Sequence, residues 1–213
     1  MDCCNVNGLN EVFNKSKAAK ESKKYLRNGL DRRAAMVLGC LTDQGISGAS
    51  ILEIGCGVGS LHMELLKRGA GSAIGVEVSQ SYVEAATDLS RNLGFQDSTQ
   101  YHTGNFVDLE DDIPSADMVI LDRVICCYPD MEGLVTASTR HTQRLYVLTY
   151  PCRTWWMRVG AWIFNFGLIA TRRQFRFFLH NPEEIGATIK AAQFSLIESA
   201  KHGPWEMAAY QRR

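Results

Sequence analysis

The chain has 213 residues, which suits one compact domain with a small appendage. Apolar residues make up 46% of the sequence and charged residues 22%, as expected for a globular protein with its own core. The 23 basic and 23 acidic residues balance, so net charge does not steer the chain toward DNA, RNA or an anionic membrane. No apolar run reaches the roughly 18 residues of a membrane-spanning helix.

The cysteines favour a reducing compartment. Their number is odd, two pairs are adjacent in sequence, and we find no secretory leader, so we expect no disulfide framework and a cytoplasmic location. No C-x-x-C motif is present, so we expect no structural metal site. The seven residues are Cys3, Cys4, Cys40, Cys56, Cys126, Cys127 and Cys152.

The first 49 residues predict a helical cap. The pattern reads as two helices separated by Gly29, with Asp31 as the N-cap of the second helix. Many lysines and arginines, Arg33 among them, crowd this segment. We interpret them as a solvated helix face, with a lid or an anion-contacting arm as the alternative.

From Ser50 onward, strands alternate with helices, which predicts a doubly wound α/β domain over residues 50–213. The fourth expected strand is continuously apolar, as a strand covered on both faces should be. The expected strands are residues 50–54, 72–78, 99–104, 116–122 and 144–150, and the helices between them are 60–69, 81–94 and 131–141.

The C-terminal part differs from this alternation. A helix over residues 182–192 precedes two strands separated by the tight sequence KHGP, which predicts a hairpin and an antiparallel strand in the sheet. Residues 152–180 form an insertion with an apolar, Trp-rich helix followed by a segment that mixes Arg and Phe. We interpret the insertion as a lid, a homodimer surface, a membrane-surface element or a helix packed on the sheet.

The sequence ILEIGCGVGS places three glycines, Gly55, Gly57 and Gly59, directly after the first strand. Glycines at such a turn let the backbone approach a ligand and leave free N–H groups at the start of the next helix. The dinucleotide motif G-x-G-x-x-G/A would need Gly or Ala where Ser60 stands. The pattern observed is instead Glu53-x-Gly55-x-Gly57-x-Gly59.

This pattern resembles motif I of the class I S-adenosylmethionine (SAM) methyltransferases. The resemblance implies a Rossmann-like seven-stranded mixed sheet of order 3-2-1-4-5-7-6, with SAM as the cofactor. Glu77 closes the second strand at the spacing of a carboxylate that accepts hydrogen bonds from both ribose hydroxyls, and Val78 beside it joins the cofactor site.

The resemblance implies two further cofactor contacts. Asn105, where the family usually has Asp, and Phe106 correspond to the segment that contacts adenine, with Asp108 as an alternative to Asn105. Asp122 and Arg123 follow the fourth strand, beyond which ligands of open α/β sheets bind. They are expected where the methionine end of the cofactor meets the acceptor.

In layout the chain is similar to a bacterial branch near magnesium-protoporphyrin O-methyltransferase. That family has a His just before Tyr128, where this chain has Cys127. The candidate proton acceptors are Tyr25, Tyr128 and His180, while we interpret His62 as helix surface. No metal is implied, because the sulfonium methyl is already activated.

We therefore expect a SAM-dependent methyltransferase that acts on a small, apolar or aromatic acceptor. An RNA or protein methyltransferase is the first alternative, since the N-terminal lysines suit RNA although the net charge does not. The second is a noncatalytic SAM-binding module, and the third is a dehydrogenase.

Overall fold

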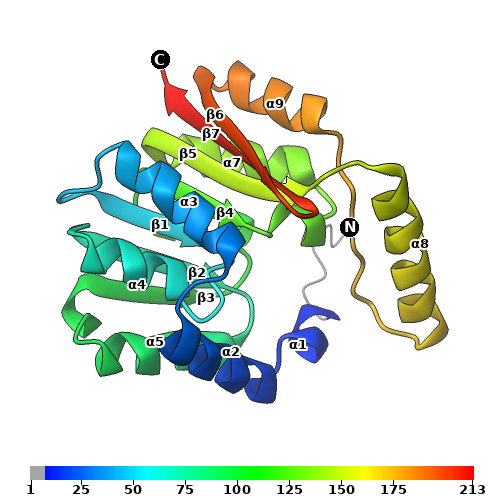
Figure 1. The fold of residues 1–213 in the computed structure, drawn as a ribbon, viewed down its shortest axis with the longest axis horizontal. Coiled ribbons are helices and arrows are strands. Elements are labelled where there is room, and N and C mark those ends of the chain that lie inside the picture. Colours follow the sequence, from blue (N-terminus) through cyan, green and yellow to red (C-terminus); the bar gives the residue numbers. More distant parts are fainter. Residues whose placement is uncertain (1–7) are drawn as a thin grey trace.

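The computed structural model describes residues 8–213. Predictions that fall on residues 1–7, including Cys3 and Cys4, lie outside this range. The described chain forms a seven-stranded sheet of order β3-β2-β1-β4-β5-β7-β6 with helices on both faces (Figure 1). Every pair of neighbouring strands is parallel except the two pairs that involve β7. The strand order implied by the family resemblance is thus confirmed.

The elements follow the expected alternation closely. The strands are β1 Ser50–Ile54, β2 Ser72–Glu77, β3 Thr99–Thr103, β4 Ala116–Asp122, β5 Thr142–Pro151, β6 Phe194–His202 and β7 Trp205–Arg212. The α-helices are α1 Leu9–Val12, α2 Lys15–Asn28, α3 Arg32–Asp43, α4 Ser60–Lys67, α5 Gln80–Asn92, α6 Phe106–Leu109, α7 Met131–Arg140, α8 Trp155–Ala170 and α9 Pro182–Ala191. Short 3-10 turns are η2 Gln96–Ser98, η3 Glu110–Asp112 and η4 Ile125–Cys127.

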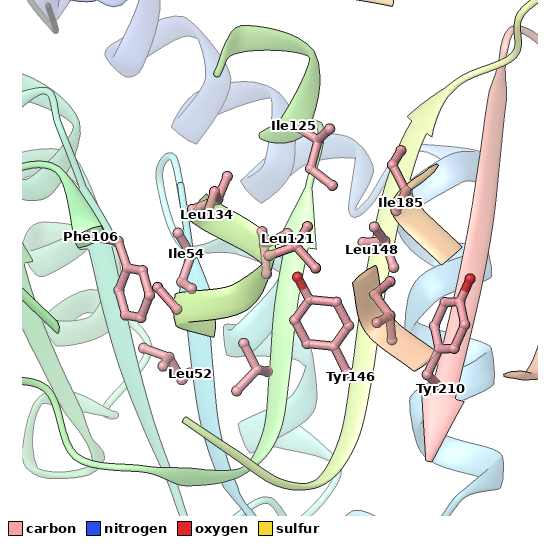
Figure 2. Packing of buried hydrophobic residues seen from close by; sticks show 14 of the residues in the cluster. Leu52, Ile54, Phe106, Leu121, Ile125, Leu134, Tyr146, Leu148, Ile185 and Tyr210 are labelled. Carbon is pink, nitrogen blue, oxygen red and sulfur yellow. The ribbon is translucent and has the colours of Figure 1, made fainter. Parts of the chain in front are cut away.

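Successive side chains of the central strands point to opposite faces of the sheet, so the strands build two cores, one on each face. Leu52 and Ile54 of β1 point to the face covered by α6, α7 and α9, where Figure 2 shows them near Leu121 and Phe106. Ile51, between them, points to the opposite face and packs with residues of α3 and α4. Because both faces are covered, the strands are apolar on both sides.

Two N-terminal helices meet at a sharp break. Gly29 has φ 71° and ends α2, and the Asp31 side chain accepts a hydrogen bond from the Ala34 N–H at 2.8 Å and begins α3, as predicted. Helix α2 packs on α5, whereas α3 shares the core with α4 and the sheet. The short connection between α2 and α3, residues 29–31, therefore links the face of the sheet to the rim above the carboxyl ends of β1 and β2.

The insertion after β5 forms a unit of its own. Figure 1 shows α8 standing clear of the sheet, beside the extended return segment of residues 172–181. Asn165 holds the two together: its Nδ2 donates to the Phe177 carbonyl at 2.7 Å, and its Oδ1 accepts from the Phe177 N–H at 2.8 Å. Among residues 8–213, no helix has both the length and the apolar character needed to cross a bilayer.

Candidate functional site

The glycine turn after β1 is built as a backbone cradle. Gly55 and Gly57 have φ of 64° and 58°, a region that residues with a Cβ rarely adopt. A Cβ on Gly55 would lie 2.5 Å from Cγ2 of Val124, so this position is also closed sterically. At Gly57 a Cβ would meet only Cδ1 of Tyr82, at an ordinary contact distance of 3.9 Å, so the positive φ alone disfavours a side chain there.

Glu77, at the end of β2, faces this turn. Its Oε2 accepts a hydrogen bond from the Gly57 N–H at 3.0 Å, and its Oε1 accepts one from the Ser79 N–H at 3.1 Å. Burial raises the pKa of Glu77, although these backbone donors oppose the shift. A carboxylate has about four lone-pair positions, so each oxygen can accept one more hydrogen bond. Val78, half-buried, follows directly.

Glu53 of β1 is tied to a buried histidine. The prediction that His62 lies on the helix surface is wrong, because its side chain is 0% exposed. Nδ1 of His62 lies 2.6 Å from Oε2 of Glu53, and Nε2 lies 2.9 Å from the Tyr101 hydroxyl. Since a carboxylate only accepts, Nδ1 carries the proton and Nε2 accepts from Tyr101. Glu53, the acidic residue of the glycine motif, thus also anchors α4.

A carboxylate paired with a guanidinium group lies at the end of β4. Asp122 pairs with the guanidinium of Arg33 and accepts a hydrogen bond from Thr149 at 2.6 Å. Arg33 is only 6% exposed, so its interpretation as part of a solvated face is wrong. It also pairs with Asp31 at 3.2 Å. Burial alone would raise the pKa of Asp31, but the Ala34 N–H and the charge of Arg33 lower it below its ordinary value.

Arg123 follows Asp122 in the left-handed conformation, with φ 62°. Its N–H donates to the Thr149 hydroxyl at 2.9 Å, which fixes the turn at this point of the chain. A non-glycine residue in this region is uncommon and costs about 1–2 kcal/mol. Thr149 thus links the Asp122 carboxylate and the Arg123 backbone, a role that the strand pattern of β5 does not reveal.

The glycine turn, Glu53 and the charged groups at the end of β4 line one cavity of about 170 Å³ between α2, α3 and the turn. Glu77 lies behind the turn, bound to the Gly57 N–H, and is not part of this lining. The cavity combines backbone N–H groups, carboxylates and guanidinium groups, as a site for a zwitterionic and hydroxylated ligand requires. Its lining includes Glu21, Lys24, Tyr25, Asp31, Arg33, Glu53, Gly55, Gly57, Ser60, Asp122 and Arg123.

The predicted adenine contacts lie elsewhere on the rim. Asn105 is buried, and its Nδ2 donates to Asp108 at 3.0 Å; Gly104 before it donates its N–H to the carbonyl of Glu77. Phe106 lies in the core (Figure 2). Its ring meets the His141 ring edge-to-face, with 5.3 Å between the centroids. The structure thus brings Asn105 next to Glu77, whereas Phe106 is enclosed by core residues.

Of the candidate proton acceptors, Tyr25 lines the cavity, and its hydroxyl is engaged by α4. Its hydroxyl donates to Glu64 at 2.7 Å and accepts from Lys67 at 2.9 Å. Burial raises its pKa to about 12, despite the opposing hydrogen bond from Lys67. These bonds pack α2 on α4, and the role of Tyr25 in proton transfer stays a prediction.

Tyr128 and His180 are brought together. Nε2 of His180 lies 2.9 Å from the carbonyl oxygen of Tyr128, and the His180 ring stacks on Phe178. A carbonyl oxygen only accepts, so Nε2 carries a proton and Nδ1 of the neutral ring is an acceptor. Cys127, next to Tyr128, lies with its Sγ 3.8 Å from the carbonyl of Arg123.

Comparison with known proteins finds similarity to methyltransferases. A family described as "Methyltransferase domain" matches residues 51–144. The chain is 27% identical to magnesium-protoporphyrin O-methyltransferase of Rhodobacter capsulatus over 66% of this chain and 62% of that enzyme. It is 30% identical to a 23S rRNA (uracil(1939)-C(5))-methyltransferase of Azoarcus over 52% of this chain and 24% of that enzyme. The chain thus spans less than two thirds of either relative.

A solved structure gives the same fold over nearly the whole chain. The crystal structure of magnesium protoporphyrin IX methyltransferase from Synechocystis PCC 6803 with bound S-adenosylhomocysteine (SAH) superposes on this chain with a TM-score of 0.76 and 18% sequence identity. The superposition covers 96% of this chain and 98% of that one. Together with the sheet order, this superposition shows that the chain has the fold of that methyltransferase.

Proposed function

We propose that the protein transfers the methyl group of SAM to a small, apolar or aromatic acceptor. The observation that carries this proposal is the Glu77 carboxylate, which faces the Gly57 N–H at 3.0 Å across the carboxyl ends of β1 and β2. The Gly57 N–H already donates to this carboxylate and so is not free for a pyrophosphate oxygen, whereas two ribose hydroxyls would satisfy the remaining lone pairs of Glu77. The geometry therefore favours an adenosyl ligand without a phosphate.

The cavity provides groups of both signs for the amino-acid end of SAM. The guanidinium groups of Arg33 and Arg123 suit its carboxylate, and Asp122 and the cavity side of Glu53 suit its ammonium group. The Arg33–Asp122 pair spans α3 and β4, so a bound zwitterion would bridge the N-terminal segment and the sheet. We accordingly assign residues 1–49 as a cap and residues 50–213 as the methyltransferase domain.

SAM supplies an activated sulfonium methyl group, which leaves by in-line displacement. The protein then has to hold the acceptor in line, an effect worth about 7–11 kcal/mol for well-oriented groups. A carboxylate or thiolate acceptor needs no base, but a hydroxyl or amine does. We assign that role to Nδ1 of His180, whose ring is oriented by the Tyr128 carbonyl and by stacking on Phe178.

The acceptor class follows from the insertion of residues 152–180. Its return segment, residues 172–181, contains His180 and contacts Tyr128 through it. The same segment carries Phe177 and Phe178, close in sequence to arginines. Aromatic and guanidinium groups together suit a flat, apolar acceptor that carries carboxylates. The similarity to enzymes named for magnesium protoporphyrin supports this class, and we expect the acceptor to differ from theirs near Cys127, where the resembling family has a His. The cysteine content favours a reducing, cytoplasmic setting for this reaction.

Turnover of methyl-labelled SAM, with release of SAH, tests the proposal. The acceptors would be a panel of porphyrin and smaller aromatic carboxylic acids and phenols. With a phenol acceptor, His180→Gln should lower kcat at least tenfold with little change in SAH affinity, and His202→Gln on the exposed hairpin serves as the control. SAH binding without turnover of any acceptor would indicate a noncatalytic module, and methylation of RNA in preference to the panel would overturn the acceptor class.

A further inference from the structure

Helix α8 exposes one entirely apolar face to solvent. We call this the outer face of α8: Trp155, Val159, Trp162, Ile163, Phe166 and Ile169. Trp155 is 78% exposed and Trp162 is 69% exposed, although burial of such side chains is strongly favourable in water. At helical spacing these residues share one side of the helix, and the rings of Trp162 and Phe166 stack at 5.9 Å.

The opposite side of α8 is covered by the chain itself, which fixes the outer face outward. Asn165 is bonded twice to the Phe177 backbone, and Leu168 on the same side is buried. Phe164 meets the edges of Phe175 and Phe177 at 6.4 and 6.3 Å. Because these contacts use the inner side, closing the helix onto the sheet would not bury the outer face without breaking them.

The charges around α8 all have one sign. Residues 152–181 contain five arginines and no acidic residue, in a chain whose total charge is zero. Four of the five are exposed, and none of them pairs with a carboxylate within residues 8–213: Arg153, Arg158, Arg172 and Arg173. They flank the outer face at both ends of the helix and along one edge.

We propose that the outer face of α8 docks in the interface of an anionic phospholipid bilayer. An apolar helical face with flanking basic residues is typical of helices that lie in the plane of a membrane, and tryptophan is favoured at this depth. A second copy of the chain fits less well. In a two-fold interface each face meets its own equivalent, so arginines would oppose arginines with no acid to pair with them.

Helix α8 is connected to the proposed acceptor end of the site through the return segment. The inference concerns membrane binding and goes beyond the proposed reaction. After α8 the chain returns along η4, where the Phe178 N–H donates to the Cys126 carbonyl at 2.7 Å. His180 then contacts Tyr128. Docking of α8 on a bilayer would therefore hold the proposed acceptor end close to the membrane, with the return segment between them.

Flotation with vesicles of phosphatidylcholine and phosphatidylglycerol tests the docking directly. The full-length protein should float with these vesicles, and much less with phosphatidylcholine alone or at high salt. Trp155→Ser/Trp162→Ser should lower partitioning at least tenfold, whereas the matched control Leu26→Ser/Leu196→Ser, at exposed apolar positions elsewhere, should not. Unchanged binding of the tryptophan variant would overturn the proposal.

A second pair of double variants tests how much the arginines contribute to vesicle binding. Arg172→Gln/Arg173→Gln should lower partitioning about 25-fold, because each basic residue near an anionic surface contributes about 1 kcal/mol. Arg91→Gln/Lys190→Gln removes the same charge from exposed helices elsewhere and should leave partitioning unchanged. Failure of the wild-type protein to float, with or without dimerisation in light scattering, would contradict the proposal.

Fluorescence locates the contact. Of the four tryptophans, only Trp205 lies outside α8, so Trp205→Phe leaves emission from α8 alone. Its emission should shift to the blue on addition of anionic vesicles and be quenched by brominated lipid. Flotation without either change would place the contact on another surface and overturn the assignment to α8. Because this readout needs neither SAM nor an acceptor, failure of the proposed reaction would not affect it.

Discussion

Glu77→Ala should lower the affinity for SAH by about two to four orders of magnitude. The Glu77 carboxylate can accept one additional hydrogen bond on each oxygen, beyond those from Gly57 and Ser79. Hydrogen bonds to a charged group contribute about 1.5–3 kcal/mol each, so two ribose hydroxyls account for about 3–6 kcal/mol. At about 1.4 kcal/mol per tenfold change, this range gives the stated loss.

Isothermal titration calorimetry of SAH measures this loss, with circular dichroism melts to confirm that the variant is folded. Glu84→Ala removes an exposed carboxylate from the following helix and should leave the affinity unchanged. Because burial raises the pKa of Glu77, acidification should weaken SAH binding to the wild-type protein before an ordinary glutamate would protonate. A folded Glu77→Ala variant with wild-type affinity would refute the assignment of Glu77 to the ribose.

Three further predictions concern stability and the turn. Arg33→Met should destabilise the protein by about 3 kcal/mol in urea unfolding, because Asp122 loses its buried partner, and adding Asp122→Leu should restore part of this loss. Burial alone would raise the pKa of Glu64, but hydrogen bonds from neighbouring lysine, tyrosine and arginine side chains lower it from 4.5 to about 2. Its stabilisation is present above pH 4.5 and lost as pH falls toward 2, so Glu64→Gln should flatten the acid side of the stability profile; an unchanged profile would contradict this. Gly57→Ala and Gly45→Ala, both at positive φ, should each cost about 1–2 kcal/mol, but only Gly57→Ala should weaken SAH binding; equal affinities would show that the turn does not contact the ligand.

Much of the fold could be predicted from local patterns. Alternation of apolar strands with helices indicated the doubly wound sheet, and the KHGP turn indicated the hairpin of β6 and β7. Asp31 as a helix N-cap could also be predicted, since an Asp side chain satisfies free N–H groups at a helix start. These features depend on residues close together in sequence, where spacing carries the information.

The burial of Arg33 and His62 could not be predicted in this way. Arg33 is neutralised by Asp122, 89 positions away, and nothing in the local pattern of α3 distinguishes it from exposed arginines. His62 stands on α4 at a position that faces Glu53 across the glycine turn, so its environment depends on how the turn directs the helix. Burial of a polar side chain requires a partner, and partners come from the tertiary fold.

Phe106 illustrates the same limit for an apolar residue. The motif alignment suggested an adenine contact, but the short helix α6 turns the ring inward against His141. A phenylalanine after a strand suits either a ligand surface or the core, and the choice depends on the direction of the following chain. Glu77 does lie at the strand end beside backbone N–H groups, as its position in the sequence predicted, and its contact with the ribose stays a prediction.

The crystal structure of the protein with SAH tests the central assignment most directly. We predict both ribose hydroxyls within about 2.6–3.2 Å of the Glu77 carboxylate oxygens, with the amino-acid end between Arg33 and Asp122. A ribose bound away from Glu77, or a dinucleotide pyrophosphate seated on the glycine turn in place of SAH, would contradict it.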